Sequence, residues 1–187
     1  MKRHLLTGLL VLLALGAKAQ GNEWKDPRVN EVNRLPMHSS FFAFENDKAA
    51  KGEKEQAANY MTLHGTWKFN WVKDADARPT DFWKTDFNDG GWDTMPVPGM
   101  WELNGYGDPL YVNIGYAWKN QFKNNPPEFP IKDNHVGSYR KEITVPASWN
   151  GKQIIVHFGS VTSNIYLWVM VVLWAIARIA SWRPSST

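Results

Sequence analysis

The clearest alternation of polar and apolar positions lies in the first half of the chain. Over Met61-Thr62-Leu63 and again over 66–72, large apolar side chains alternate with polar ones, as in Trp67-Lys68-Phe69-Asn70-Trp71. A period of two residues is typical of a β-strand with one buried face. We therefore predict a half-buried strand in this region.

Turn residues and shorter alternating segments follow this strand. Asp89-Gly90-Gly91-Trp92 predicts a turn, and the two prolines of 95–101 predict a stiff, extended segment. Alternation returns over 137–145 and 152–158, with the turn signal Asn150-Gly151 between them. Both segments are predicted strands, joined as neighbours by a short connection.

Helical signals are few. Pro79–Trp83 has the composition of a helix start, with Thr80 or Asp81 available as an N-cap, and 45–59 is either an exposed loop or a brief helix. Short strands linked by Gly, Pro and Asn turns are typical of all-β domains. The sequence therefore predicts an all-β fold, a jelly-roll β-sandwich over 60–169.

Residues 1–19 have the three parts of a secretory signal peptide. The basic pair Lys2-Arg3 precedes an uncharged, Leu-rich run over 5–17, and Ala17-Lys18-Ala19 fits a cleavage site. We expect cleavage after this motif, export to the periplasm or the cell surface, and a mature chain that begins with an extended or loop segment over 20–59. A buried N-terminal helix is the alternative.

The signal peptide also explains the charge. The chain has 21 Lys and Arg against 18 Asp and Glu, a formal charge of +3. Removing the three basic residues of 1–19 leaves 21 − 3 = 18 of each sign. A neutral mature chain lacks the basic surface that nucleic acids require, so we expect no nucleic-acid partner. The lack of cysteine excludes a disulfide scaffold and a cysteine-ligated metal centre.

Eleven Trp residues are the other unusual feature of the composition. Some lie in or beside predicted strands, where core packing is the simpler interpretation: Trp67, Trp71 and Trp149. Others lie in loop-rich segments, where an amphipathic ring can stack on the face of a sugar: Trp92, Trp101 and Trp118. Composition alone does not choose between the two interpretations.

A series of motifs in a fixed order gives more specific information. They are Asn33-Arg34-Leu35-Pro36-Met37-His38, Leu63-His64-Gly65-Thr66-Trp67-Lys68-Phe69, Asp89-Gly90-Gly91-Trp92, Val97-Pro98-Gly99-Met100-Trp101-Glu102, Gly105-Tyr106-Gly107-Asp108-Pro109-Leu110-Tyr111-Val112-Asn113, Pro126-Pro127, Gly137-Ser138-Tyr139-Arg140 and Gly159-Ser160-Val161-Thr162-Ser163. Together they make residues 30–169 resemble the N-terminal region of family 2 glycoside hydrolases, the β-galactosidases.

This resemblance implies a jelly-roll, sugar-binding domain that precedes two further β domains and a catalytic TIM barrel. The family hydrolyses terminal β-D-galactosides with retention, using two Glu residues of the barrel. We therefore expect no catalytic residue in this chain, and we interpret its loop carboxylates Glu102, Asp108 and Glu128 as solvated or structural. Full-length members use Mg and Na ions, and no cofactor is expected in this fragment. The expected partners are a galactoside or glycan and the remaining domains of the enzyme.

One site residue is implied by the resemblance. The family string Pro-Leu-Tyr-x-Asn places its Asn at the edge of the galactose pocket, where the side-chain amide bonds sugar hydroxyls. In this sequence that residue is Asn113. A turn-forming Asn is the alternative that the residues alone would favour.

The resemblance stops after Val169. The family continues with an Asn-Gly turn, a strand and a Gly-Tyr-Ser-Glu-Asp-Ser segment, whereas this chain continues with Met170-Val171-Val172 and an apolar run. If one base is restored after the codon of Val169, a suitable back-translation of 170–187 reads Asn-Gly-Arg-Phe-Val-Gly-Tyr-Ser-Glu-Asp-Ser in the other frame. We therefore expect a one-base deletion, genuine or a sequencing error, and an out-of-frame tail over 170–187.

Such a tail has physical consequences. We expect it to replace the last strands of the sandwich, which leaves an unpaired edge, an incomplete core and a chain that is aggregation-prone and inactive as a glycosidase. Two alternatives stay open. The chain is a free-standing carbohydrate-binding module, or it is a membrane-anchored surface protein that uses the uncharged run 158–177 as a span.

Overall fold

The structure is a computed structural model of the full chain. It describes residues 23–36, 39, 41–109, 118, 122–123, 128–161, 163–178 and 185–186. The chain divides into two compact units: residues 1–35, 80–87 and 155–187 form the first, and residues 36–79 and 88–154 form the second.

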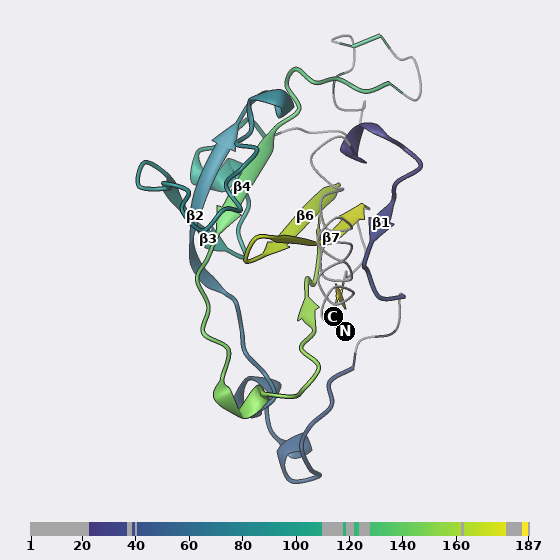
Figure 1. Ribbon diagram of the computed structural model, residues 1–187, viewed down its shortest axis with the longest axis vertical. Coiled ribbons are helices and arrows are strands. Elements are labelled where there is room, and N and C mark those ends of the chain that lie inside the picture. Colours follow the sequence, from purple (N-terminus) through teal and green to yellow (C-terminus); the bar gives the residue numbers. More distant parts are fainter. Residues whose placement is uncertain are drawn as a thin grey trace, which may run out of the picture. The chain divides into compact units, whose positions relative to one another are not determined.

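The second unit is built on a three-stranded antiparallel sheet. Strand β2 (Gly65–Val72) lies at its centre, between β3 (Asp93–Val97) and β4 (Val136–Arg140) (Figure 1). The predicted strand over 66–72 is thus confirmed, whereas 61–63 lies outside the sheet. The segment over 95–101 is extended as far as Val97, where β3 ends.

The alternation in β2 places its aromatic rings on one face. Phe69 has no exposed surface, and Trp67 and Trp71, two positions away on either side, are partly buried. Met95 of β3, which lies opposite Trp67, is also fully buried. Burying a side chain of this size stabilises the fold by about 1.5–3 kcal/mol, so these rings are the main source of stability in this unit.

The predicted strands after this sheet are shorter in the structure. Strand β4 ends at Arg140 instead of at 145, and β5 is confined to Val156–His157. The turns are where the sequence placed them: the Trp92 N–H donates to the carbonyl of Asp89 (3.0 Å), and Gly151 has a left-handed φ of 75°.

The first unit contains a second three-stranded antiparallel sheet. A hairpin of β6 (Asn164–Val169) and β7 (Val172–Arg178) is joined by β1 (Glu31–Val32), in the order β1-β7-β6. Strand β5 pairs with β8 (Ser185–Ser186). Both sheets are antiparallel, which confirms the mostly-β prediction.

Strand β7 corrects one expectation. We predicted that residues after Val169 leave an unpaired edge, but β7 is the central strand and pairs with β6 and β1. Ile176 is fully buried, and its neighbours Ala175 and Ala177 are at most 9% exposed, so both faces of β7 are covered.

The same strands exclude the span over 158–177. A membrane-spanning helix needs about 20 apolar residues in one helix, and residues 164–169 and 172–178 are strands instead. None of the helices in the described ranges is long and apolar enough to cross a membrane. The membrane-anchor interpretation of this segment is therefore wrong.

Helical structure in the described residues is limited to six short 3₁₀ turns. These are η1 (Glu23–Lys25), η2 (Ala49–Lys51), η3 (Lys54–Gln56), η4 (Ala75–Ala77), η5 (Glu102–Asn104) and η6 (Ala147–Trp149). The helix start predicted at Pro79–Trp83 is wrong, because this segment forms consecutive turns. Its Phe82 ring packs edge-to-face against Trp168 of β6 at 5.3 Å, and this contact replaces the stabilisation that a short helix lacks.

Candidate functional site

The predicted site residue Asn113 lies outside the described residues. Its loop can still be followed from both ends, because the chain is described up to residue 109 and again from 128, with Trp118 between. The site is therefore built here from the residues that hold this loop, which runs from 108 to 133 and is called the long loop below.

The start of the long loop is fixed by Tyr106. Two glycines in left-handed conformations flank it, with φ of 87° at Gly105 and 73° at Gly107, and they turn the chain sharply around its ring. The Tyr106 hydroxyl donates to an oxygen of Asp93 (3.0 Å), and its ring lies 4.8 Å from the Phe69 ring, edge-to-face. Burial and then the bond to Asp93 raise the pKa of Tyr106.

The same aromatic cluster reaches β4. The Trp101 ring packs on Phe69 (6.2 Å between centroids), and its indole N–H donates to the hydroxyl of Tyr139. Burial raises the pKa of Tyr139. Trp101, one of the three candidates for sugar stacking, therefore has a packing role in this cluster.

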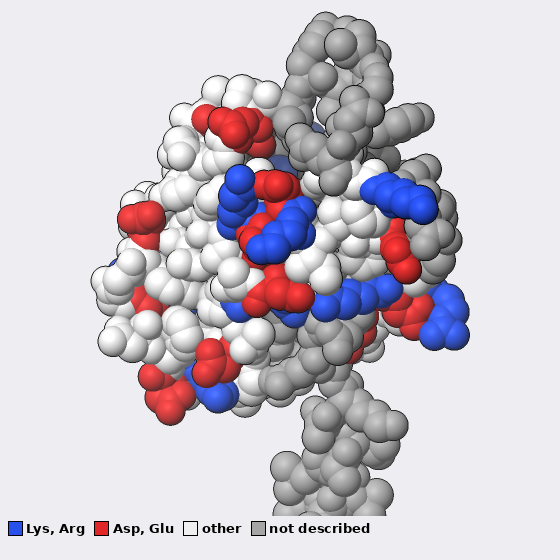
Figure 2. All heavy atoms as spheres, turned by 90° about the horizontal axis from the view of Figure 1, so that it is seen from above, with Lys and Arg blue, Asp and Glu red and all other residues white. Residues whose placement is uncertain are grey.

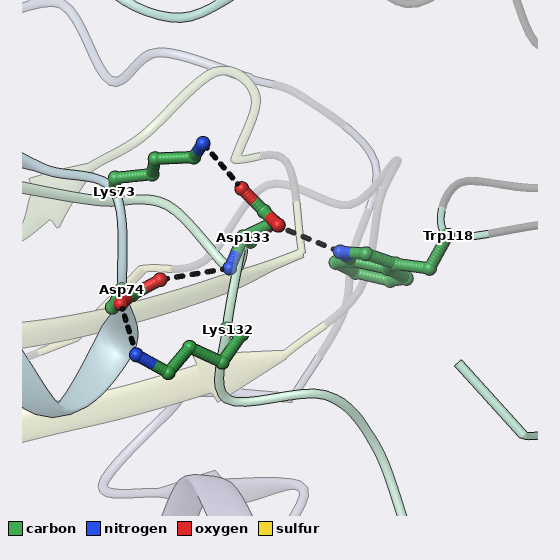
Figure 3. A network of polar contacts seen from close by, with 5 residues as sticks. All are labelled: Lys73, Asp74, Trp118, Lys132 and Asp133. Atoms are coloured by element: carbon green, nitrogen blue, oxygen red, sulfur yellow. Dashed lines mark hydrogen bonds and ion pairs between the residues drawn. The ribbon is translucent and has the colours of Figure 1, made fainter. Parts of the chain in front are cut away.

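The end of the long loop is fixed by charged residues (Figure 3). Asp74, just after β2, accepts the backbone N–H of Asp133 (2.9 Å) and the ammonium of Lys132 (3.0 Å). The Asp133 carboxylate in turn pairs with Lys73 at 2.9 Å. The backbone N–H of Ala75 adds a bond to the carbonyl of Ile131 (3.1 Å). We call Lys73, Asp74, Lys132 and Asp133 the charged anchor.

These contacts shift the pKa values of the charged anchor in the direction that strengthens it. The backbone N–H of Asp133, and then Lys132, hold the pKa of Asp74 below its ordinary value. The hydrogen bond to Asp133 raises the pKa of Lys73. Both groups are therefore ionised over the neutral range, when each ion pair is complete.

Trp118 is attached to the charged anchor. Its indole N–H donates to the backbone carbonyl of Asp133 at 2.9 Å, as Figure 3 shows. Both residues have left-handed backbones, with φ of 63° at Trp118 and 53° at Asp133. Asp adopts this region fairly readily, but a bulky aromatic residue does so rarely.

Sequence reasoning did not identify Tyr106, Asp74 or Asp133. The Gly-Tyr-Gly string was a signal for the first, because a residue between two glycines marks a sharp turn. The bond between Asp74 and Asp133 joins residues 59 apart in the sequence, and a single sequence contains no pattern that links them.

The remaining carboxylates do not form a catalytic or metal-binding group. Glu102, Asp108 and Glu128 are all exposed. Within the described ranges, no three His, Asp or Glu side chains lie close enough together to hold a metal ion. On the face drawn in Figure 2, Lys and Arg side chains are interspersed with Asp and Glu, and neither sign forms a continuous patch.

Comparison with known proteins gives a consistent set of relatives. Residues 60–179 match the family described as Glycosyl hydrolases family 2, sugar binding domain. The chain is 37% identical over 145 residues to a β-galactosidase of Halalkalibacterium halodurans, an alignment that covers 78% of this chain and 14% of the relative. It is 31% identical over 149 residues to a β-galactosidase of Priestia megaterium, covering 79% and 14%. It is 34% identical over 157 residues to a β-galactosidase large subunit of Leuconostoc lactis, covering 77% and 24%. The chain thus spans between 14% and 24% of the length of these curated relatives.

Proposed function

Because this chain belongs to the family 2 glycosyl hydrolases, over their sugar binding domain, we propose that it is the N-terminal sugar-binding domain of an exported β-galactosidase. The observation that carries the proposal is the match over residues 60–179 together with relatives that are β-galactosidases. The ligand is a terminal β-D-galactoside, and Asn113 at the pocket edge bonds its hydroxyls. The complete fold of 60–169 is a jelly-roll sandwich, which the antiparallel sheets support.

The way the long loop is held supports a binding role. A side chain that recognises a sugar must be kept within about 0.5 Å of its productive position. The long loop carries Asn113, and Tyr106 fixes its start while the charged anchor fixes its end. All of these contacts lie within the second unit, so the chain supplies them by itself.

Catalysis is proposed to need residues beyond these 187. The two Glu residues of the family's retaining mechanism belong to its barrel, so we expect binding without hydrolysis. The test is to express the chain and measure release of nitrophenol from nitrophenyl β-D-galactopyranoside, alongside calorimetric binding of methyl β-D-galactopyranoside. Activity above background contradicts the proposal, and so does the absence of binding.

The variant Asn113→Ala tests the site residue within the same experiment. Loss of the amide removes one or two hydrogen bonds to sugar hydroxyls, so we expect the galactoside to bind about tenfold more weakly. Asn104→Ala is a matched control. Asn104 bonds only the carbonyl of Met100 among the contacts recorded for its side chain. Equal binding of glucosides, mannosides and galactosides would favour a free-standing carbohydrate-binding module instead.

Export is proposed from the signal-peptide pattern of 1–19, which lies outside the described residues. The expected outcome is a secreted chain whose first residue is Gln20, measured by mass spectrometry of the periplasmic fraction. A cytoplasmic chain that retains Met1 would overturn this part of the proposal.

The one-base deletion after Val169 stays a proposal, and the β6–β7 hairpin supports it. Two residues, Met170 and Val171, connect the strands, since Val169 pairs with Val172. Two-residue hairpin loops strongly prefer Asn-Gly, which is the dipeptide that the restored frame supplies. Sequencing the gene across codon 170 tests it: an intact frame with no family-like continuation would overturn it.

A further inference from the structure

Most described Trp rings that contact other rings do so inside the sheets. Trp67 packs edge-to-face on Tyr139 (6.3 Å), Trp71 on His135 (4.8 Å), Trp101 on Phe69 (6.2 Å), and Trp168 stacks on Tyr166 (5.7 Å). A ring committed to such contacts is not free to receive a ligand.

Trp118 differs from these rings. It is partly exposed, and within the described part of the chain no aromatic ring packs against it. Its polar edge is bound, because the indole N–H donates to the Asp133 carbonyl at 2.9 Å. The two faces of the indole therefore carry its remaining capacity for contact.

The hydrogen bond of Trp118 ends on an acceptor that is itself fixed. The N–H of Asp133 is held by Asp74, and its carboxylate is held by Lys73 (Figure 3). The carbonyl between these two constraints cannot turn away, so the indole plane has a fixed direction. A fixed ring loses little conformational entropy when a ligand stacks on it.

The backbone at both ends of this hydrogen bond is strained. Trp118 and Asp133 both have positive φ, a conformation that costs about 1–3 kcal/mol for a residue of this kind. Strain of this kind is found mostly at functional sites, where the surrounding structure maintains it. The charged anchor is the part of the structure that maintains it here.

We propose that Trp118 is an aromatic platform on which one face of a β-galactoside ring stacks, and that the charged anchor positions it. The inference rests on the proposed sugar-binding function and adds a residue to that site. In β-D-galactose the axial 4-hydroxyl leaves the hydrogens of C3, C4 and C5 together on the opposite face. This apolar patch matches the face of an indole.

Fluorine NMR of the full chain labelled with 5-fluorotryptophan tests the proposal directly. The Trp118 resonance is assigned by its loss in Trp118→Phe, and the chain is titrated with methyl β-D-galactopyranoside. Trp149 provides a matched control, assigned through Trp149→Phe. Its indole N–H also donates to a backbone carbonyl, that of Ala58 (2.8 Å), but its backbone is not left-handed.

The expected result is a saturable shift of the Trp118 resonance, with the Trp149 resonance unmoved, and binding about tenfold weaker in Trp118→Ala. Binding heat or movement of other Trp resonances without any shift at Trp118 overturns the platform and leaves the sugar-binding function standing. No heat and no shift at any Trp overturns both.

Asp74→Asn separates positioning from packing. The amide has the size of the carboxylate but loses the ion pair to Lys132 (3.0 Å). We expect a broadened Trp118 resonance and binding weakened by about threefold, with the Trp149 line width unchanged. An unchanged Trp118 line in Asp74→Asn would remove the charged anchor from the proposal.

Discussion

Gly137 shows how a single residue can fix the aromatic cluster beneath the long loop. A Cβ built at this position would lie 2.6 Å from Cζ2 of Trp101 and 2.8 Å from Cε2 of Phe69. Real Cβ atoms do not approach ring carbons so closely, and both rings are packed. The absence of a side chain at Gly137 is therefore what allows Trp101 to lie against β4.

We expect Gly137→Ala to lower the free energy of unfolding by about 1–3 kcal/mol, because the methyl group overpacks the cluster. Urea denaturation measures this. Gly91→Ala is the matched control: a Cβ there meets nothing within 4 Å, so its effect should stay within about 0.5 kcal/mol. Equal effects of the two substitutions would show that the cluster has room.

Asp74 gives the charged anchor a pH dependence. Its pKa is lowered in the folded chain, so its contribution is complete above its ordinary value, about 4, and is lost as the pH falls through the lowered folded value. The Trp118 fluorine resonance should therefore shift as the pH drops from about 5 to about 3. In Asp74→Asn this titration should disappear, and a titration that persists would assign it to another group.

At the scale of elements, the β6–β7 hairpin is well paired but has an unsuitable turn. Met170 has a φ of 56°, and an L-residue other than Gly, Asn or Asp is disfavoured there. Met170, Val171 and Val172 are between 51% and 79% exposed. The strands therefore carry this hairpin, and its connection works against it.

Met170→Gly should stabilise the chain by about 0.5–1 kcal/mol, because glycine adopts a left-handed backbone without strain. Val171→Gly should have the opposite sign, since Val171 is not left-handed and glycine there only adds freedom to the unfolded chain. Thermal unfolding of both variants checks the pair. A destabilised Met170→Gly would show that the turn is not strained.

The elements also show what could be predicted from the sequence. Strand β2 was predictable because its period-two pattern coincides with a buried face, and the turn at Asp89–Trp92 because its glycines are local signals. The helix start at Pro79–Trp83 was not, because Phe82 is held by Trp168, far along the chain. The charged anchor was missed for the same reason: Asp74 and Asp133 meet only after the sheet has formed.

At the scale of the whole molecule, the exposed hairpin tip matters for solubility. Val169, Met170, Val171 and Val172 form a continuous run of exposed aliphatic residues, and such runs promote association between chains. This is consistent with the aggregation expected from the sequence, although the run lies at a turn and not at an unpaired edge.

Val171→Lys should therefore slow aggregation, measured by light scattering at a fixed protein concentration, because it interrupts the apolar run without altering the strained residue. Leu103→Lys is the control. Leu103 is 81% exposed but stands between the polar residues Glu102 and Asn104. If both substitutions slow aggregation equally, net charge and not the hairpin tip is responsible.

The sheet of the second unit can be extended on one side only. Pro96 has no N–H to donate to Thr66, its partner in β2, so the nitrogen of Pro96 faces away from the ladder, along the outer side of β3. A strand arriving there finds a missing donor in its middle. Strand β4 contains no proline, and its outer side has no strand partner within the described residues. Growth of this sheet, by another segment of a longer chain or by a second copy, therefore has a direction: it proceeds past β4, and β3 is its end.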